Sequence, residues 1–239
     1  ILNLLNFPTQ DDTDSSVIIL TSPFSFFGRS YPQIYVNHNG FLTFDQASSN
    51  YTPIQFKSSY SGRDIIAPFW TDIDNRLNGI ISYNLYTVGN VLSRATQDIN
   101  QYFTGVSLSA LWVFVATWDK VAYFQNSGTE SSFQVVLIST GSSSFVLMNY
   151  GVIATLKSTT EVNSFKYFIK HKRNSSNVGI PGRWAFWVNG APDNSITTSK
   201  IFLGINTKHT VACKCIHTSL SVLKMLFSIL FFKILLKNT

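Results

Sequence analysis

Residues 65–79 have the sequence IIAPFWTDIDNRLNG, an apolar run that turns abruptly into alternating acids and ends at Asn78-Gly79. The apolar run predicts a buried strand in which Pro68 lies where no ladder N–H is required. Asn-Gly is the strongest short signal for a hairpin turn. The stretch therefore predicts a strand, an acidic corner and a hairpin in close succession.

Alternating β-branched and aromatic residues continue this strand pattern in both directions along the chain. Asn37-His38-Asn39-Gly40 predicts the turn of one hairpin, because Asn and Gly tolerate positive φ, and His38 at its tip is expected to be solvated. Thr140-Gly141-Ser142 predicts the turn of another. The predicted strands are 17–20, 33–36, 41–44, 65–70, 80–86, 110–121, 133–138 and 145–150.

The hydrophobic period changes between residues 91 and 103, where apolar residues recur at helical spacing and polar residues fill the opposite side. This pattern predicts one amphipathic helix that covers one side of the sheet system. The expected fold class is α+β, mostly antiparallel β, with a two-layer β-sandwich-like body and one amphipathic helix. The expected core contains Phe44, Phe69, Trp70, Trp112, Phe114, Phe133, Val135, Phe145, Leu147, Trp184 and Phe186.

The formal net charge of +6 does not predict a nucleic-acid partner once the charges are located along the chain. Residues 1–190 hold 12 Lys and Arg against 11 Asp and Glu, whereas residues 191–239 hold 6 Lys against Asp193 alone. The body thus lacks the cationic stripe that binding to a phosphate backbone needs. Both cysteines, Cys213 and Cys215, lie after residue 190, so no disulfide framework is expected in the body.

The sequence lacks the common catalytic motifs. It contains no G-x-S-x-G, H-E-x-x-H, P-loop or dinucleotide fingerprint. Residues 1–190 hold two histidines and no cysteine that could act as a nucleophile. The sequence therefore indicates a protein that is not an enzyme, and it gives no reason to expect a cofactor.

Several long motifs follow one another along the chain. They are PFSFFG (23–28), YVNHNGFLTF (35–44), IAPFWTDID (66–74) followed by Arg76 and Gly79, VATWDKV (115–121), FQVVL (133–137), NYGVI (149–153) and SNVGIPGRWAFWV (176–188). In kind and order these motifs resemble the NIDO family, the nidogen extracellular domain. The resemblance covers about residues 11–189, and it is interrupted after residue 154, where the family's Trp and Gly-rich stretch are replaced by a shorter segment.

The resemblance implies an extracellular or cell-surface protein. It implies a non-enzymatic interaction module in cell–matrix adhesion or matrix assembly, with partners among extracellular matrix or cell-surface proteins. It also implies a division of the chain into an N-terminal lead-in (1–16), a NIDO-like domain (17–190, most specific over 65–190) and a basic hydrophobic tail (191–239) outside the resemblance.

Asp72, Asp74 and Asn75 are candidate metal ligands, because D-x-D-N begins like a calcium loop. The stretch lacks the glycine at the sixth position and the glutamate at the twelfth. The favoured interpretation therefore has the carboxylates capping turn N–H groups or pairing with Arg76. The alternative is a calcium-dependent glycan-binding domain. The acidic run 11–14 offers the same choice between a solvated turn and a metal-binding loop, and the lack of a nearby fourth ligand favours the turn.

Two glycosylation sequons agree with an extracellular location. They begin at Asn50, where Pro53 follows directly and disfavours use of the sequon, and at Asn174. Each lies in a polar loop, at 46–63 and at 154–176 respectively. Because the strands are expected to be buried in the core, we expect the residues that bind a partner to lie in these two loops.

The tail contains a hydrophobic run at 220–236, which is at the short limit of a membrane span and includes Lys224 and Lys233. Its membrane contact stays open, and the alternatives are, in order, a non-homologous tail from a wrongly assigned gene end, a weak anchor and an interfacial helix. The tail also holds zinc-ligand residue types, at a spacing that does not fit a structural zinc module: His209, Cys213, Cys215 and His217.

Overall fold

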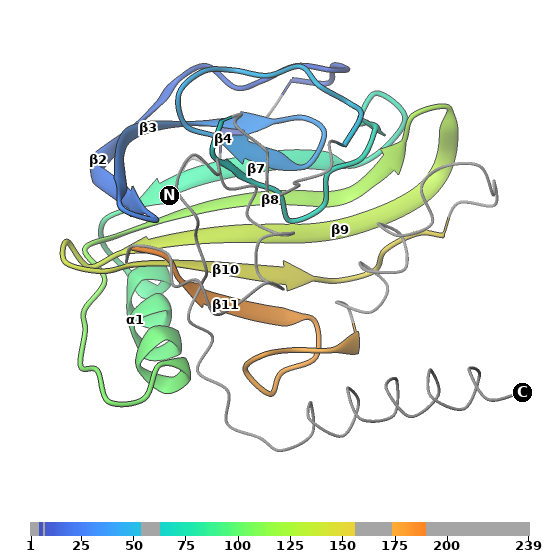
Figure 1. Cartoon of the computed structure of the whole chain (residues 1–239). Coiled ribbons are helices and arrows are strands. Elements are labelled where there is room, and N and C mark those ends of the chain that lie inside the picture. The colour runs from blue at the N-terminus through green and yellow to red at the C-terminus, as the bar shows by residue number, and fades with distance from the viewer. Residues whose placement is uncertain (1–4, 7, 54–62, 156–173, 190–239) are drawn as a thin grey trace, which may run out of the picture.

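Two antiparallel β-sheets packed face to face, with one helix against the larger sheet, form the part of the chain that the structure describes (Figure 1). This computed structural model describes residues 5–6, 8–53, 63–155 and 174–189. The expected α+β class, with mostly antiparallel strands in two layers and a single helix, is confirmed for these residues.

The smaller sheet consists of β2 (Ile18–Phe26), β3 (Arg29–Asn37), β4 (Phe41–Thr43) and β5 (Ile65–Ile66), in that order across the sheet. Strands β2 and β3 form a hairpin whose register shifts between Ile19 and Phe24. The predicted hairpin of β3 and β4 is confirmed, with Val36 opposite Leu42. Strand β2 therefore lies at the border of this sheet.

The larger sheet runs in the order β1 (Leu5–Asn6), β7 (Ile80–Tyr86), β8 (Trp112–Tyr123), β9 (Asn126–Ser139), β10 (Ser144–Tyr150) and β11 (Arg183–Trp187). A short strand, β6 (Ile73–Asp74), pairs with the end of β8. Every pairing is antiparallel. The predicted hairpin of β9 and β10 is confirmed, because Phe145 lies opposite Ile138 and Tyr150 opposite Phe133.

The main core lies between the two sheets and follows from the alternation of side chains along each strand. In β8, Trp112, Phe114 and Trp118 point toward the smaller sheet and are fully buried. The ring of Trp118 stacks on Phe133 of the neighbouring strand, with centroids 4.9 Å apart. Such aromatic pairs add to the burial of apolar area, so this layer fixes how the two sheets face each other.

Helix α1 (Asn90–Tyr102) covers the opposite face of the larger sheet, within one residue of the predicted helix at each end (Figure 1). Its buried residues Ala95 and Ile99 join a second apolar cluster with Val113 and Phe145. The larger sheet is thus covered on both faces in this region, which explains why β8 is apolar along nearly its whole length.

Ten of the eleven expected core residues are buried, and Trp184 is half-buried. Trp184 packs at the margin of the main core and stacks on Phe186, with centroids 6.5 Å apart. It lies on β11, which among the described residues is the border strand of the larger sheet, so one side of its ring lacks a neighbouring strand.

The hairpin expected at Asn78-Gly79 is wrong. Strands β6 and β7 run in the same direction along β8, and the residues between them leave the sheet as a loop. Gly79 has φ +92°, and a Cβ at this position would lie 2.5 Å from the backbone of Val121. The Asn78 side chain donates to the Thr129 carbonyl at 3.0 Å. The Asn-Gly pair thus permits close approach to an irregularity in β8 instead of reversing the chain.

Candidate functional site

The acidic corner, defined here as residues 10–15, 37–39 and 72–76, brings together three segments that are distant in the sequence. The lead-in runs antiparallel to the end of β3, with Asp14 opposite Asn37, and meets β6, with Asp11 opposite Asp74. The Ser15 N–H donates to the Val36 carbonyl at 2.9 Å. Backbone bonds therefore place the acids of the lead-in beside those of residues 72–74.

Asp74 is tied to Arg76 as the sequence predicted. The Asp74 Oδ1 accepts from the Arg76 backbone N–H at 3.0 Å and from Arg76 Nε at 2.8 Å. Arg76 Nη2 donates to Asp74 Oδ2 at 2.8 Å and to Asp11 Oδ2 at 2.6 Å. These hydrogen bonds lower the pKa of Asp74 below its ordinary value, although burial opposes them.

The pKa of Asp11 is raised, first by burial and then by repulsion from the Asp74 carboxylate, while Arg76 acts in the opposite direction. The Asp11 Oδ1 atom is buried and has no hydrogen-bond partner among the described residues. One arginine thus serves two carboxylates, and Asp11 is the less well compensated of the two.

A layer of buried polar side chains supports these charges. Asn75 is 4% exposed and its Oδ1 accepts from the Gln10 backbone N–H at 3.1 Å and lies 2.8 Å from His38 Nε2. The expectation that His38 is solvated is therefore wrong, because this side chain is 0% exposed. Its backbone carbonyl also accepts from Trp118 Nε1 at 3.0 Å, so the turn tip is packed against the core.

Asn39 has a similar role on the other side of the corner. Its side chain is fully buried, donates to Asp12 Oδ1 at 2.7 Å and accepts from the Ile73 backbone N–H at 2.8 Å. One amide side chain thereby connects the lead-in, the β3–β4 turn and β6. Because buried polar groups are costly when they lose partners, these amides hold the three segments in one arrangement.

Asp14 connects the corner to the loop 45–53. Its carboxylate accepts from Asn37 Nδ2 at 3.0 Å and from the Ser48 backbone N–H at 2.9 Å. Burial raises the pKa of Asp14 to about 6, although the Ser48 hydrogen bond opposes this shift. Further along the same loop, the Asn50 carbonyl accepts from Trp70 Nε1 at 3.1 Å.

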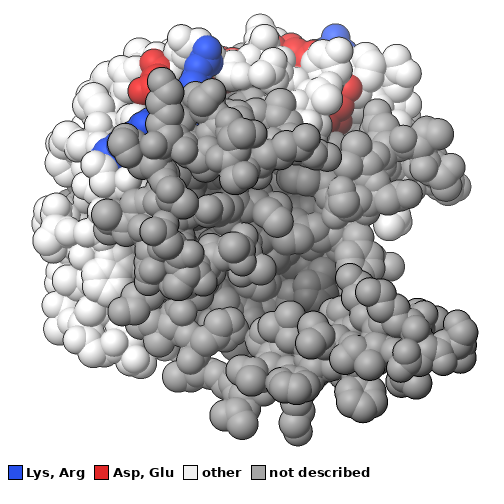
Figure 2. Space-filling model, viewed as in Figure 1, with Lys and Arg blue, Asp and Glu red and all other residues white. Residues whose placement is uncertain are grey.

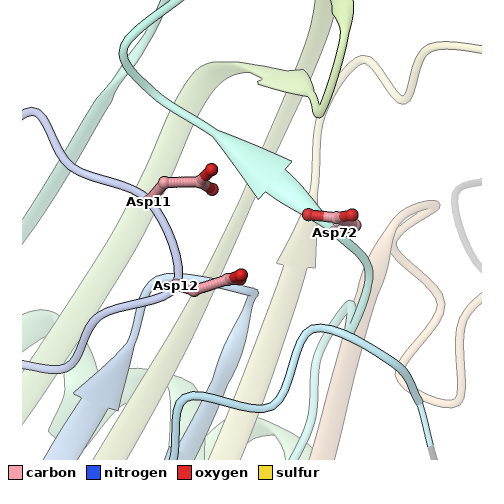
Figure 3. A group of neighbouring side chains, drawn as sticks. All are labelled: Asp11, Asp12 and Asp72. Atoms are coloured by element: carbon pink, nitrogen blue, oxygen red, sulfur yellow. The ribbon is translucent and has the colours of Figure 1, made fainter.

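Of the predicted set Asp72, Asp74 and Asn75, the structure separates Asp72 from the other two. Asp72 faces Asp11 and Asp12, and one carboxylate oxygen from each of these three residues lies within 4.8 Å of the others (Figure 3). All three are half-buried. Three carboxylates in such a group can supply the oxygen ligands that Ca²⁺ prefers.

The sequon residues Asn50 and Asn174 are both exposed. The tail, including its hydrophobic run 220–236, lies outside the described residues, as do the most central parts of the loops 46–63 and 154–176. In the described ranges, no helix has both the length and the apolar character that a membrane span requires. The zinc-ligand residue types of the tail also lie outside these ranges: His209, Cys213, Cys215 and His217.

Figure 2 shows that charged side chains are few on the described surface of this view and gather along its upper rim. Lys and Arg form no continuous stripe on the part of that face that is described. Asp11 and Asp12 belong to one sequence motif and Asp72 to another, so their convergence was not predicted. A signal for it could come only from the pairing of the lead-in with β6, which is a long-range contact.

The family model for the nidogen-like domain, NIDO, matches residues 32–167. Human alpha-tectorin is 34% identical over 87% of this chain and 12% of its own length. Drosophila melanogaster nidogen is 28% identical over 75% of this chain and 15% of its own length, and mouse nidogen-2 is 28% identical over 85% and 14% respectively.

The chain thus spans only about 12 to 15% of the length of these curated relatives. No solved structure gives a significant match. The family match covers more than half of the chain and includes two of the three segments of the corner (37–39 and 72–76), the β3–β4 turn and both main hairpins of the larger sheet. This chain therefore belongs to the nidogen-like (NIDO) domain family and is extracellular, like its relatives alpha-tectorin and the nidogens.

Proposed function

We propose that this chain is a non-enzymatic interaction module that acts in cell–matrix adhesion or matrix assembly, with partners among matrix or cell-surface proteins. Membership of the NIDO family supports the matrix setting. One observation carries the rest: the buried polar side chains of the acidic corner bond to each other and to backbone groups, in particular His38 with Asn75 and Asp74 with Arg76. Groups committed in this way hold a fold together and are poorly placed to move protons on a substrate.

The loop 45–53 is the described surface best suited to recognition. It is exposed over most of its length, and the acidic corner fastens it at Ser48 while Trp70 fastens it at Asn50. Tyr51 directly follows Asn50, the second of these two bonded positions, and 52% of its surface is exposed. A tethered loop loses little conformational entropy when it binds, and exposed tyrosines are enriched at protein interfaces.

The direct test is retention of the full chain on extracellular matrix at physiological salt, comparing Tyr51→Ala with Val88→Ala. Val88 is 73% exposed but lies just before α1, away from the loop, so its variant controls for loss of any exposed apolar side chain. We expect Tyr51→Ala to weaken matrix binding about tenfold or more, the effect of removing an interface anchor, and Val88→Ala to leave it unchanged. Equal binding by both variants would remove the loop from the proposal.

The proposal would fail as a whole if the unmodified chain retained no matrix or cell-surface partner. The variant Asn50→Gln belongs in the same experiment, because it abolishes the sequon while Tyr51→Ala preserves it. Mass spectrometry of the secreted chain should show glycan at Asn174 and a smaller fraction at Asn50, since Pro53 follows that sequon. Chains that carry no glycan at either Asn50 or Asn174 would contradict the sequon prediction.

Calcium-dependent glycan binding is the second candidate, and one observation favours it. Asp72 meets Asp11 and Asp12, and Asp11 Oδ1 is buried without a hydrogen-bond partner among the described residues. Calorimetry with calcium chloride separates the candidates, with Asp72→Asn compared to Asp45→Asn, an exposed acid outside the group. We expect no saturable heat from the unmodified chain. A micromolar site abolished by Asp72→Asn alone would favour the glycan-binding candidate.

A further inference from the structure

The outer edge of β2, residues 16–22, is an open border of the smaller sheet. This sheet has the order β2-β3-β4-β5, so β2 has a strand neighbour on one side only. Beyond this edge the strand is anchored to the larger sheet: the Ser25 N–H donates to Ser144 Oγ at 3.2 Å, and Phe27 N–H bonds to the Val188 carbonyl. Among the described residues, no strand pairs with the free side of residues 16–22.

The side chains of this edge are those that normally avoid exposure. Val17 is 45% exposed and Ile19 is 65% exposed, while the alternate residues Ile18 and Leu20 face the main core. Residues 16–22 carry no charge and no proline. Natural edge strands are usually protected by lysine, by proline or by a bulge. The pairing of β2 with β3 has one irregularity, between Ile19 and Phe24, but residues 16–22 contain no lysine and no proline, and Ile19 stays exposed. This uncharged edge therefore keeps only part of the usual protection against pairing with another strand.

We propose that this edge pairs with the same edge of a second copy of the chain, antiparallel and related by a two-fold axis at Ile19. The segment is self-complementary in that register. Ile19 meets Ile19 of the second copy, Val17 meets Thr21, and Ile18 meets Leu20. These central pairs join aliphatic or β-branched side chains, the combinations that stabilise antiparallel strands, and Ser16 meets Ser22 at the two ends. Two smaller sheets become one continuous sheet across the axis.

Charge placement agrees with a second copy as the occupant. The acids Asp11, Asp12 and Asp14 precede the edge and are held in the acidic corner, so no like charges meet within the ladder. At the other end Pro23 lacks an N–H, and the register of β2 with β3 shifts before Phe24, which closes the ladder after Ser22. An isologous contact of this kind closes as a dimer and does not propagate into a fibre.

The test is sedimentation velocity of the full chain between about 1 and 100 µM, because self-association follows mass action. We expect the mean mass to rise from monomer toward dimer over this range. Ile19→Lys places a charge on each side of the axis and should raise the dimer dissociation constant at least tenfold. Val88→Lys adds the same charge at a more exposed position away from the edge and should dimerise like the unmodified chain.

Thermal unfolding of each variant in dilute solution confirms that the chain still folds. A chain that stays monomeric over the whole range overturns the proposal, even if the edge then binds an extended segment of another protein. Dimerisation of Ile19→Lys with an unchanged dissociation constant overturns it too, because the contact must then lie elsewhere, for instance in the tail. The inference does not depend on the matrix partner, so loss of matrix binding leaves it standing.

Discussion

The acidic corner and the β2 edge are adjacent in the sequence and opposite in character. At the corner, polar side chains such as Asn75 and His38 are buried and bonded to each other. At the edge, aliphatic side chains such as Ile19 are exposed. In these two segments, therefore, the burial of a side chain depends on which strands lie beside it and not on its polarity. Changes at the corner should therefore alter stability, and changes at the edge should alter association.

The largest effect is expected at Gly40, in the β3–β4 turn beside the corner. Gly40 has φ +85°, and a Cβ there would lie 2.0 Å from the Phe69 carbonyl oxygen. Gly28 offers a matched control, because it has φ +80° and nothing within 4 Å of its Cβ position. We expect Gly28→Ala to cost about 1 kcal/mol of unfolding free energy and Gly40→Ala about 3 kcal/mol more, measured by urea unfolding. Equal losses would show that the turn is not packed as described.

Asn75→Ala should have the next largest effect. The change removes the acceptor of the Gln10 N–H and the partner of the His38 ring, which leaves buried polar groups without bonds. A loss of about 2 to 4 kcal/mol in unfolding free energy is expected. Asn126→Ala, which removes a hydrogen bond at an exposed turn, should cost less than about 1 kcal/mol. If the two variants were equally stable, the corner would not hold the lead-in.

The pH dependence of stability should separate two acids within the corner. The folded pKa of Asp14 is about 6, above its ordinary 3.8, so the native state binds more protons between these values. Its contribution to stability is present below about pH 4 and is lost as the pH rises through about 6. Asp74 has the opposite sign, because its lowered pKa gives stability that is lost in acid.

Unfolding of Asp14→Asn as a function of pH tests this difference. We expect the variant to lose the part of the decline in unfolding free energy between about pH 4 and pH 6 that Asp14 causes, and to retain the acid loss that Asp74 causes. Any decline that the raised pKa of Asp11 causes should remain. Asp45→Asn, in the exposed loop after β4, serves as the control and should keep both features. A decline that persists in Asp14→Asn must come from another group.

The smallest effect on stability is expected at the β2 edge. Ile19 is 65% exposed, so Ile19→Lys removes little buried area and should change the unfolding free energy of the dilute chain by less than about 0.5 kcal/mol. Urea unfolding at low protein concentration measures this directly. A loss of about 2 kcal/mol or more would mean that the side chain is buried within the monomer.

Local patterns predicted the elements of the fold, because their signals lie within a few residues. The helical spacing at Ala95 and Ile99 placed α1 within one residue at each end, and the turn at residues 140–142 joined β9 to β10. Such features depend on period and turn chemistry, both of which a single sequence contains. The two-layer arrangement could also be predicted, because the apolar side chains of the β9–β10 hairpin need a second layer that covers them.

Long-range contacts explain what the sequence did not predict. His38 and Asn75 contact each other although they are 37 residues apart in the sequence. The polar turn around His38 therefore gave no local sign that this side chain is buried. Asn78-Gly79 carries a hairpin signal, but it lies against an irregularity of β8 that arises later in the chain. The same holds for the meeting of Asp72 with Asp11 and Asp12, which depends on the pairing of the lead-in with β6.

Hydrogen exchange of backbone amides at low and high protein concentration compares the two regions in one measurement. We expect the amides of residues 10–15 that bond to the corner to be protected at both concentrations, because their partners lie in the same chain. Amides of residues 16–22 that do not bond to β3 should exchange fast in dilute solution and become protected as the dimer forms. Fast exchange in 10–15, or protection in 16–22 that does not change with concentration, would contradict the contrast between a closed corner and an open edge.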